Sequence, residues 1–205
     1  LLGTVDIEED GSCMFEAPAN VPIALQPIDS EGKKLQEMRS WLVGMPGENL
    51  SCVGCHEQQN YASPNTRTIA ARKKPQQIKE WYGPMRGFDF NREVQVVLDR
   101  NCVGCHDGNP DKKTRMGDPL PDFRYQEGRG RSRAYEALHP YVRRNGPEGD
   151  YHLLNPREFH PDTSEIVRLL EKGHKNVKLS AEDWDRLNTW IDLNAPFHGT
   201  WKEIA

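Results

Sequence analysis

Cys52-Val53-Gly54-Cys55-His56 and Cys102-Val103-Gly104-Cys105-His106 are two identical pentapeptides, and they dominate what the sequence says about the fold. Cys-x-x-Cys-His is the attachment signature of c-type haem, in which the two thiols add to the vinyl groups of the porphyrin. The two intervening residues set the spacing of the thiols, and the histidine that follows lies under the iron, where a ring nitrogen can bind it. The repeated pattern therefore predicts two covalently attached haem c groups, one on each pentapeptide.

Zinc and redox chemistry are the alternatives for these cysteines. Two Cys-x-x-Cys pairs suit a four-thiolate zinc site. However, far more residues separate Cys55 from Cys102 than the roughly 15–20 that are usual in such sites, and zinc does not require a histidine after both pairs. A redox dithiol belongs in a βαβ fold, and the sequence lacks that pattern. Haem is favoured because histidine follows both pairs.

The composition of the 205-residue chain excludes two classes of protein. Hydrophobic residues make up 36% of it and the mean hydropathy is -0.82, so we expect no membrane span. The formal net charge of -4 argues against binding to nucleic acid through phosphate contacts. Two buried macrocycles would supply apolar volume that the side chains lack. Because haem is attached to this motif outside the cytoplasm, we expect a periplasmic or extracellular protein.

Residues 1–50 alternate apolar and polar side chains between turn signals. Short runs of this kind, separated by about 8–12 residues, predict a small N-terminal β-sandwich-like module. Cys13, the one cysteine outside the pentapeptides, falls in one of these runs. We expect it to be a buried thiol in a strand, the alternative being a link to another chain or to a haem.

Residues 51–205 are expected to form a mostly helical, cytochrome c-like dihaem domain with long loops, so that the fold class is α+β. We assign the first haem to residues 52–91 and the second to a unit over residues 92–205. A helix predicted over residues 92–100 runs straight into the second pentapeptide, with Val94, Val97 and Leu98 on one face.

Two further helices are predicted near the C-terminus. Thr163 can act as the N-cap of the first, and Gly173 supplies its stop. Ser180 caps the second, with Asp183 three residues later as in a capping box.

Five histidines outside the pentapeptides are candidates for the second axial ligands: His139, His152, His160, His174 and His198. His174 is our first choice for the second haem, because it lies between the two capped helices. The order of helix, pentapeptide, long loop, ligand loop and closing helix resembles the class I cytochrome c fold, whose distal ligand lies just before the last helix. His198 is the next choice, for either iron, and His160 is a further ligand candidate or a helix cap.

The first haem has fewer candidates. Tyr61 lies five residues beyond His56 and is close enough along the chain to approach that iron. A tyrosine ligand is typical of haem enzymes rather than of electron carriers. The alternative for Tyr61 is an ordinary packing aromatic.

The long middle loop is basic. Such charges are usually just solvated, but arginine is also the natural partner of a haem propionate or of an acidic protein. The residues concerned are Arg124, Arg129, Arg131, Arg133, Arg143 and Arg144.

Several segments, taken in order, resemble the α subunit of hydrazine synthase and its relatives. They are Phe15-Glu16-Ala17-Pro18-Ala19-Asn20, Met38-Arg39-Ser40-Trp41, Pro46-Gly47-Glu48 and Trp190-Ile191-Asp192-Leu193-Asn194-Ala195-Pro196. These relatives are multidomain exported cytochromes. The resemblance implies a second haem with two histidine ligands, which would be His106 with His174 or His198. It also implies an unusual first haem with Tyr61 on the iron and His56 diverted to zinc.

Two functions follow as expectations. The one we favour from the sequence is electron transfer by an exported dihaem cytochrome, with a redox protein or further copies of itself in a multihaem assembly as partner. The alternative is a haem oxidoreductase subunit that is similar to hydrazine synthase. It would act on a small nitrogen compound at an open or tyrosine-bound first haem.

Overall fold

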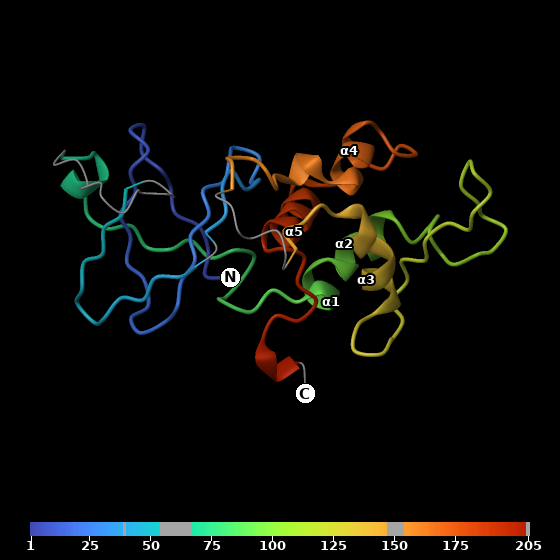
Figure 1. The fold of residues 1–205 in the computed structure, drawn as a ribbon, viewed down its shortest axis with the longest axis horizontal. Coiled ribbons are helices and arrows are strands. Elements are labelled where there is room, and N and C mark those ends of the chain that lie inside the picture. The colour runs from blue at the N-terminus through green and yellow to red at the C-terminus, as the bar shows by residue number, and fades with distance from the viewer. Residues whose placement is uncertain (39, 54–66, 147–153, 204–205) are drawn as a thin grey trace. The chain divides into compact units, whose positions relative to one another are not determined.

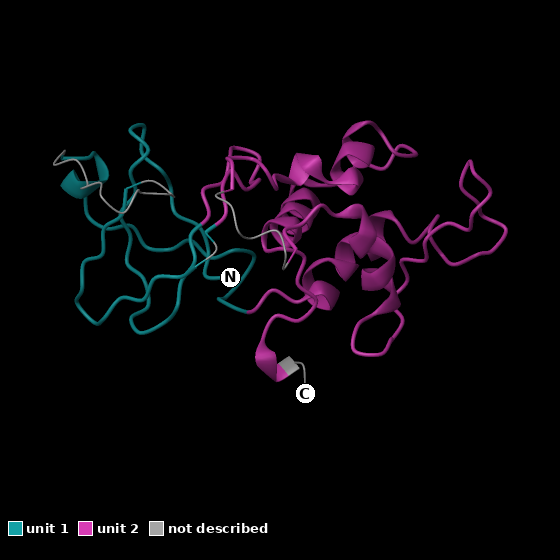
Figure 2. Ribbon diagram, viewed as in Figure 1, with its two compact units in different colours: residues 1–25, 38–86 teal, residues 26–37, 87–205 magenta. Residues whose placement is uncertain are grey.

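The computed structural model describes residues 1–38, 40–53, 67–146 and 154–203 (Figure 1). The chain forms two compact units (Figure 2). Unit 1 comprises Leu1–Leu25 and Met38–Arg86, and unit 2 comprises Gln26–Glu37 and Gly87–Ala205. The sequence predicts a domain boundary at residue 50, with both haems in residues 51–205. That boundary stays a prediction.

Unit 1 is held together by single bridges between irregular segments. Its one helix in the described part is the 3₁₀ turn η1 (Ala70–Arg72). The antiparallel bridges pair Thr4 with Lys79 and Ile23 with Leu42, and a parallel bridge pairs Phe15 with Gln76.

The predicted β-sandwich module, and with it the α+β fold class, is therefore wrong, since the described residues contain no strand longer than a single bridge. Pro18, Pro22 and Pro27 interrupt the alternating pattern, and proline cannot donate a hydrogen bond to a ladder. Cys13 is likewise exposed and lies outside any strand, contrary to the buried thiol expected there.

Unit 2 contains the α-helices of the described chain. Their bounds are α1 (Phe90–Glu93), α2 (Gln95–Asn101), α3 (Arg133–Leu138), α4 (Glu165–Glu171) and α5 (Ala181–Asp192). Short 3₁₀ turns accompany them: η2 (His139–Tyr141), η3 (Pro161–Thr163) and η4 (Trp201–Glu203).

The core of unit 2 forms where α1, α3 and α5 meet. Phe90 is fully buried, and its ring lies 5.2 Å from Tyr135 of α3 and 5.2 Å from Trp190 of α5. Val94, Val97 and Leu98 are buried as predicted, because their spacing places them on one face of the helical segment. This cluster anchors α2, the helix that leads into the second pentapeptide.

The ends of α4 and α5 follow from local capping. Ser180 accepts a hydrogen bond from the backbone N–H of Asp183 and so caps α5, as predicted. The N-cap of α4 is Ser164, not Thr163, because Thr163 belongs to η3 and donates its hydroxyl to the carbonyl of His160. Gly173 follows the C-cap of α4 with a φ of 89°, the left-handed conformation that ends helices.

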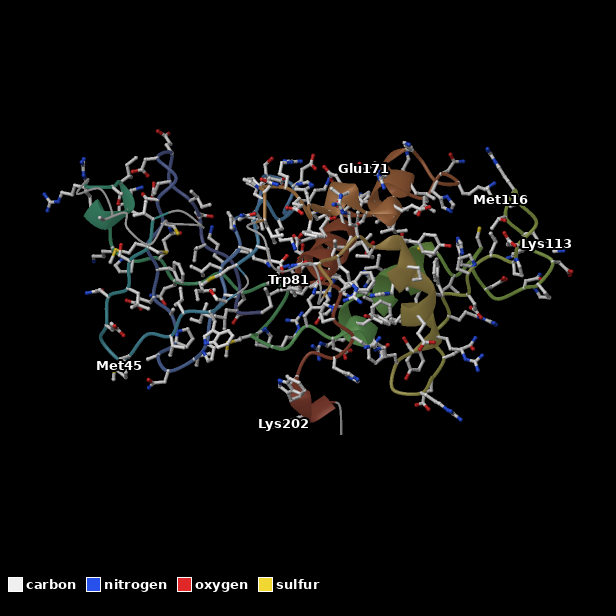
Figure 3. The ribbon with its side chains drawn as sticks, viewed as in Figure 1. Met45, Trp81, Lys113, Met116, Glu171 and Lys202 are labelled. Atoms are coloured by element: carbon white, nitrogen blue, oxygen red, sulfur yellow. The ribbon has the colours of Figure 1, made fainter. Side chains whose placement is uncertain are left out.

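The segment Gln26–Glu37 packs within unit 2 through buried polar contacts. The backbone N–H of Lys34 donates to the carboxylate of Asp192 at 2.9 Å, and the Lys34 ammonium donates to the Asp192 carbonyl at 3.1 Å. The neighbouring Lys33 ammonium is also buried, and it pairs with Asp162 at 2.6 Å and Glu171 at 2.9 Å. Figure 3 labels Glu171 at the end of α4.

Candidate functional site

The second pentapeptide continues the last turn of α2. The N–H of Cys102 donates to the carbonyl of Leu98 at 2.8 Å, and the N–H of His106 donates to the carbonyl of Cys102 at 2.9 Å. Residues four apart with such a bond share a face of the turn. Both thiols and the imidazole of the motif are thereby brought to one side of the backbone.

Asp183 fastens the start of α5 to the end of α2. Its buried carboxylate accepts hydrogen bonds from Arg100 and Asn101, each at 3.2 Å. A charge-assisted contact therefore joins α2, which leads into the pentapeptide, to α5, which follows His174.

His106 is oriented by two residues of the loop that follows it. Its Nδ1 lies 3.0 Å from the carbonyl oxygen of Pro121, which can only accept, so Nδ1 carries the proton. The imidazole also stacks on the ring of Phe123, with ring centres 4.6 Å apart and planes 26° apart. This leaves Nε2 with its lone pair, which is the state a metal-binding imidazole requires.

His174 faces His106. The two ring centres are 6.0 Å apart and the planes are inclined by 33°. The turn that presents His174 has left-handed backbone at Gly173, Lys175 and Asn176, and the N–H of Val177 closes it on the carbonyl of His174 at 2.9 Å. Burial, with smaller effects from His106 and Lys175, lowers the pKa of His174, so its ring is neutral near pH 7 and able to bind a metal.

The thiols of the second pentapeptide differ in exposure. Cys102 is half-buried, and burial, with smaller effects from Asp183 and Cys105, raises the pKa of its thiol to about 11. Cys105 is exposed. Both are free thiols in this structure, and their spacing suits addition to two vinyl groups on one edge of a porphyrin.

The other predicted ligands lie elsewhere. His160 is buried and acts as the cap of η3: its Nδ1 accepts from the N–H of Asp162 at 3.3 Å, and its Nε2 lies 3.2 Å from Asp29. His198 packs its ring on its neighbour Phe197, with ring centres 4.7 Å apart. Of the three alternatives for the second haem, the structure brings only His174 against His106 in the described part of the chain.

The first pentapeptide is only partly described. Cys52 is exposed, whereas Cys55, His56 and Tyr61 lie outside the described residues, as does His152. Within unit 1, partial burial and, to a smaller degree, the effect of Cys52 raise the pKa of the Cys13 thiol. Among the residues that the structure describes, no group of three or more histidine, cysteine, aspartate or glutamate side chains is arranged to hold a metal ion.

Sequence reasoning missed the residues that position His106. Pro121 lies 15 residues beyond the histidine, and nothing in the local pattern points to its carbonyl. Phe123 and Asp183 were likewise not predicted to take part. The signal that could have found Asp183 was its place at the N-terminus of a predicted helix, where a buried carboxylate also meets the helix dipole.

Two comparisons with known proteins found similarity to the alpha subunit of hydrazine synthase. Residues 1–57 match the family model of the hydrazine synthase alpha subunit middle domain. A second match is the hydrazine synthase subunit alpha of Kuenenia stuttgartiensis, which is 23% identical over 208 aligned positions. That alignment covers 76% of this chain and 26% of the relative, so the chain spans about a quarter of that protein. No solved structure matches the chain significantly.

The family match ends one residue beyond the first pentapeptide, so that motif lies within it. The longer alignment extends the similarity over most of the chain. Together the two comparisons support a hydrazine synthase-like relationship for this protein.

Proposed function

We propose that this chain is the haem-bearing part of an oxidoreductase that is similar to the hydrazine synthase alpha subunit. The first pentapeptide would carry the reactive haem c, which acts on a small nitrogen compound, and the second would carry a low-spin haem c that passes electrons. The observation behind the proposal is that similarity to hydrazine synthase alpha includes the first pentapeptide and extends over 76% of the chain.

The residues around His106 fit a haem with two histidine ligands. Two imidazoles bound on opposite sides of one metal ion, each through a nitrogen–metal bond of about 2 Å, have ring centres roughly 6 Å apart. The 6.0 Å between His106 and His174 matches that requirement. In addition, Pro121 holds the His106 proton on the nitrogen that faces away from such a metal.

Each residue then has a role toward the bound group. Cys102 and Cys105 would hold the haem covalently, and His106 and His174 would bind its iron. When bound, haem supplies reversible one-electron chemistry, at a lower potential than a histidine–methionine pair gives. Phe123 and Asp183 keep the proximal ring and the two flanking helices in position.

The first site is proposed on the sequence and the resemblance. Cys52 and Cys55 would hold the haem covalently, Tyr61 would bind or approach its iron, and His56 would bind iron or a nearby zinc ion. An iron with an open or weakly bound position admits substrate, which a six-coordinate iron does not.

A dihaem electron carrier is the second candidate function. It is supported by the close approach of the His106 and His174 rings, which would suit an iron that only passes electrons. Its partner would be a redox protein or further copies of this chain.

Location follows from the same chemistry. We propose a periplasmic or extracellular protein, because c-type haem is attached outside the cytoplasm. In the described part of the chain, no helix has the length and apolar character that crossing a membrane requires.

Spectroscopy on the chain produced with a c-type haem maturation system tests the proposal. We expect an intact mass with two haems, one low-spin iron inert to carbon monoxide, and one iron that binds carbon monoxide and nitric oxide. Two inert low-spin irons would instead support the electron carrier. A colourless chain with the bare mass would overturn both.

Paired variants assign the two spectra. Cys102→Ala with Cys105→Ala should remove the low-spin haem and leave the reactive one. Cys52→Ala with Cys55→Ala should do the reverse. Loss of the carbon monoxide-binding signal in Cys102→Ala with Cys105→Ala would contradict the assignment of the sites.

A further inference from the structure

Four side chains on and around α3 form a cationic cluster that the proposed haem ligands do not use: Arg131 precedes the helix, Tyr135 lies on it, and His139 and Arg144 follow it. We name Arg131, Tyr135, His139 and Arg144 the α3 cluster. The Arg131 guanidinium lies over the Tyr135 ring, 5.4 Å from its centre. The Tyr135 and His139 rings lie 5.2 Å apart with planes inclined by 35°. The His139 Nε2 is buried and has no hydrogen-bond partner among the described residues.

Both arginines act on both rings. Burial, then Arg144 and Arg131, lowers the pKa of His139. Burial raises the pKa of Tyr135, and Arg131 and Arg144 oppose that rise. Within the described chain, no carboxylate forms an ion pair with either arginine. The cluster therefore concentrates positive charge around a nitrogen that lacks a partner.

The neighbouring groups are already committed to other contacts. The Tyr135 hydroxyl donates to the carbonyl of Ala195 at 2.9 Å, so it supports the cluster without offering a free donor. Arg133 reaches Gln126 at 3.5 Å, and Arg143 lies over the Phe159 ring. The free donors of this region are therefore those of Arg131, Arg144 and His139.

We propose that the α3 cluster binds a carboxylate. A guanidinium presents paired N–H groups whose spacing matches a carboxylate, and the unpartnered His139 Nε2 gains an acceptor when it carries the ring proton. Two arginines with no acidic partner also supply the charge that offsets the desolvation of an anion.

The carboxylate has two possible sources with the same chemistry. One is a propionate of the second haem, which rests on the proposed function. Tyr135 packs against Phe90 and Trp190 in the core of unit 2, the unit that also contains the second pentapeptide and the His174 turn. The other source is a free small carboxylate.

A double variant tests the propionate. In the haem-loaded chain, Arg131→Gln with Arg144→Gln removes both charges, and Arg133→Gln, at the first residue of α3, is the matched control. If a propionate occupies the cluster, the double variant should lower the midpoint potential of the low-spin haem. It should also raise the pH at which that potential titrates, since the propionate loses its stabilising cations. The control should change neither.

Thermal unfolding tests the free carboxylate. Sodium acetate is compared with sodium chloride at equal ionic strength. At about 10 times the dissociation constant, acetate should raise the midpoint of the wild-type chain and of Arg133→Gln by about 3–5 °C, and should leave the double variant unchanged.

The outcomes separate the two sources. A changed potential without an acetate effect identifies the propionate, and an acetate effect without a changed potential identifies a free carboxylate. If neither measurement distinguishes the double variant from Arg133→Gln, the proposal is overturned. If no haem is attached at the second pentapeptide, the proposed function fails, and the acetate measurement still decides this inference. Should the double variant not fold, Arg131→Lys with Arg144→Lys keeps the charge, removes the fork, and should show a reduced effect of the same sign.

Discussion

At the scale of single residues, the carbonyl of Pro121 decides which nitrogen of His106 is free. Its distance of 3.0 Å from Nδ1 places the proton there, and the stacked Phe123 prevents the ring from turning. The ring of His174 lies close by, with its centre 6.0 Å from that of His106. The site is thus arranged by backbone and packing contacts before any metal is considered.

Substitution of His174 by alanine tests the distal ligand. In the haem-loaded chain we expect one iron to change from low spin to high spin and to become reactive to carbon monoxide, because its sixth position opens. Electron paramagnetic resonance would show the loss of one low-spin signal. His198→Ala is the control, since that ring packs on Phe197. Loss of the signal in His198→Ala alone would move the ligand to His198.

Asp192 predicts a pH dependence of stability. Burial raises its pKa from 3.8 to about 7, against the opposing effect of Lys34. A carboxyl with a raised folded-state pKa stabilises the fold while protonated, and this contribution is lost as the pH rises from about 4 to about 7. Urea unfolding at pH 5, 6, 7 and 8 measures this effect. Relative to the wild type, the free energy of unfolding of Asp192→Asn should increase by up to about 1.4 kcal/mol for each pH unit as the pH rises to 7.

The matched control for that series is Asp118→Asn, because Asp118 is exposed. The free energy of unfolding of Asp118→Asn, plotted against pH, should run parallel to that of the wild type. If Asp192→Asn also runs parallel, the carboxyl is ionised throughout this pH range and the assignment of its pKa is wrong.

At the scale of elements, the site depends on the meeting of α1, α3 and α5 around Phe90. Replacing this fully buried ring by alanine leaves a cavity between the three helices, and we expect a loss of about 3–5 kcal/mol in the free energy of unfolding. Denaturant unfolding measures it. Trp201→Ala, in which an 88% exposed ring is removed, should change stability by less than about 0.5 kcal/mol. Equal effects would contradict the placement of the core.

The helix before the second pentapeptide and the two helices around the His174 turn were predictable, whereas α3 and the N-terminal unit were not, for physical reasons. The stripe around Val97 and the cap at Ser180 are local signals, and both are confirmed. The alternating pattern before residue 50 is also local, but strands need partners. There Ile7 is 52% exposed, and within the described residues the bridges that pair the backbone of unit 1 are single ones.

Part of the candidate site was likewise predictable from the sequence, and part was not. The place of His174 before the last helix was visible in the order of elements. The contacts of His106 with Pro121 and of Asp183 with Asn101 join residues that only tertiary structure brings together, so spacing alone could not reveal them.

At the scale of the whole molecule, the chain has a modest apolar supply, with 36% hydrophobic residues. Several apolar side chains of unit 1 remain exposed, among them Trp41 at 67% and Met45 at 68% (Figure 3 labels Met45). In unit 2 the loop that carries Lys113 and Met116 is also exposed. Bound macrocycles would add contacts that these segments lack.

Hydrogen exchange should reveal that contribution. In the haem-loaded chain we expect slow exchange at the N–H of Val177, which closes the His174 turn. The pair Cys102→Ala with Cys105→Ala should make it faster, and Cys52→Ala with Cys55→Ala should leave it unchanged. Equal exchange in both pairs would show that the turn does not respond to a group at the second pentapeptide.

The distance along the chain between His106 and His174 bears on biosynthesis. A polypeptide that leaves a translocation pore with its N-terminus first exposes the two thiols and the proximal imidazole well before the opposing imidazole emerges. If haem is attached during export, as proposed, it would meet Cys102, Cys105 and His106 first, and His174 would complete the site once α4 and α5 have folded.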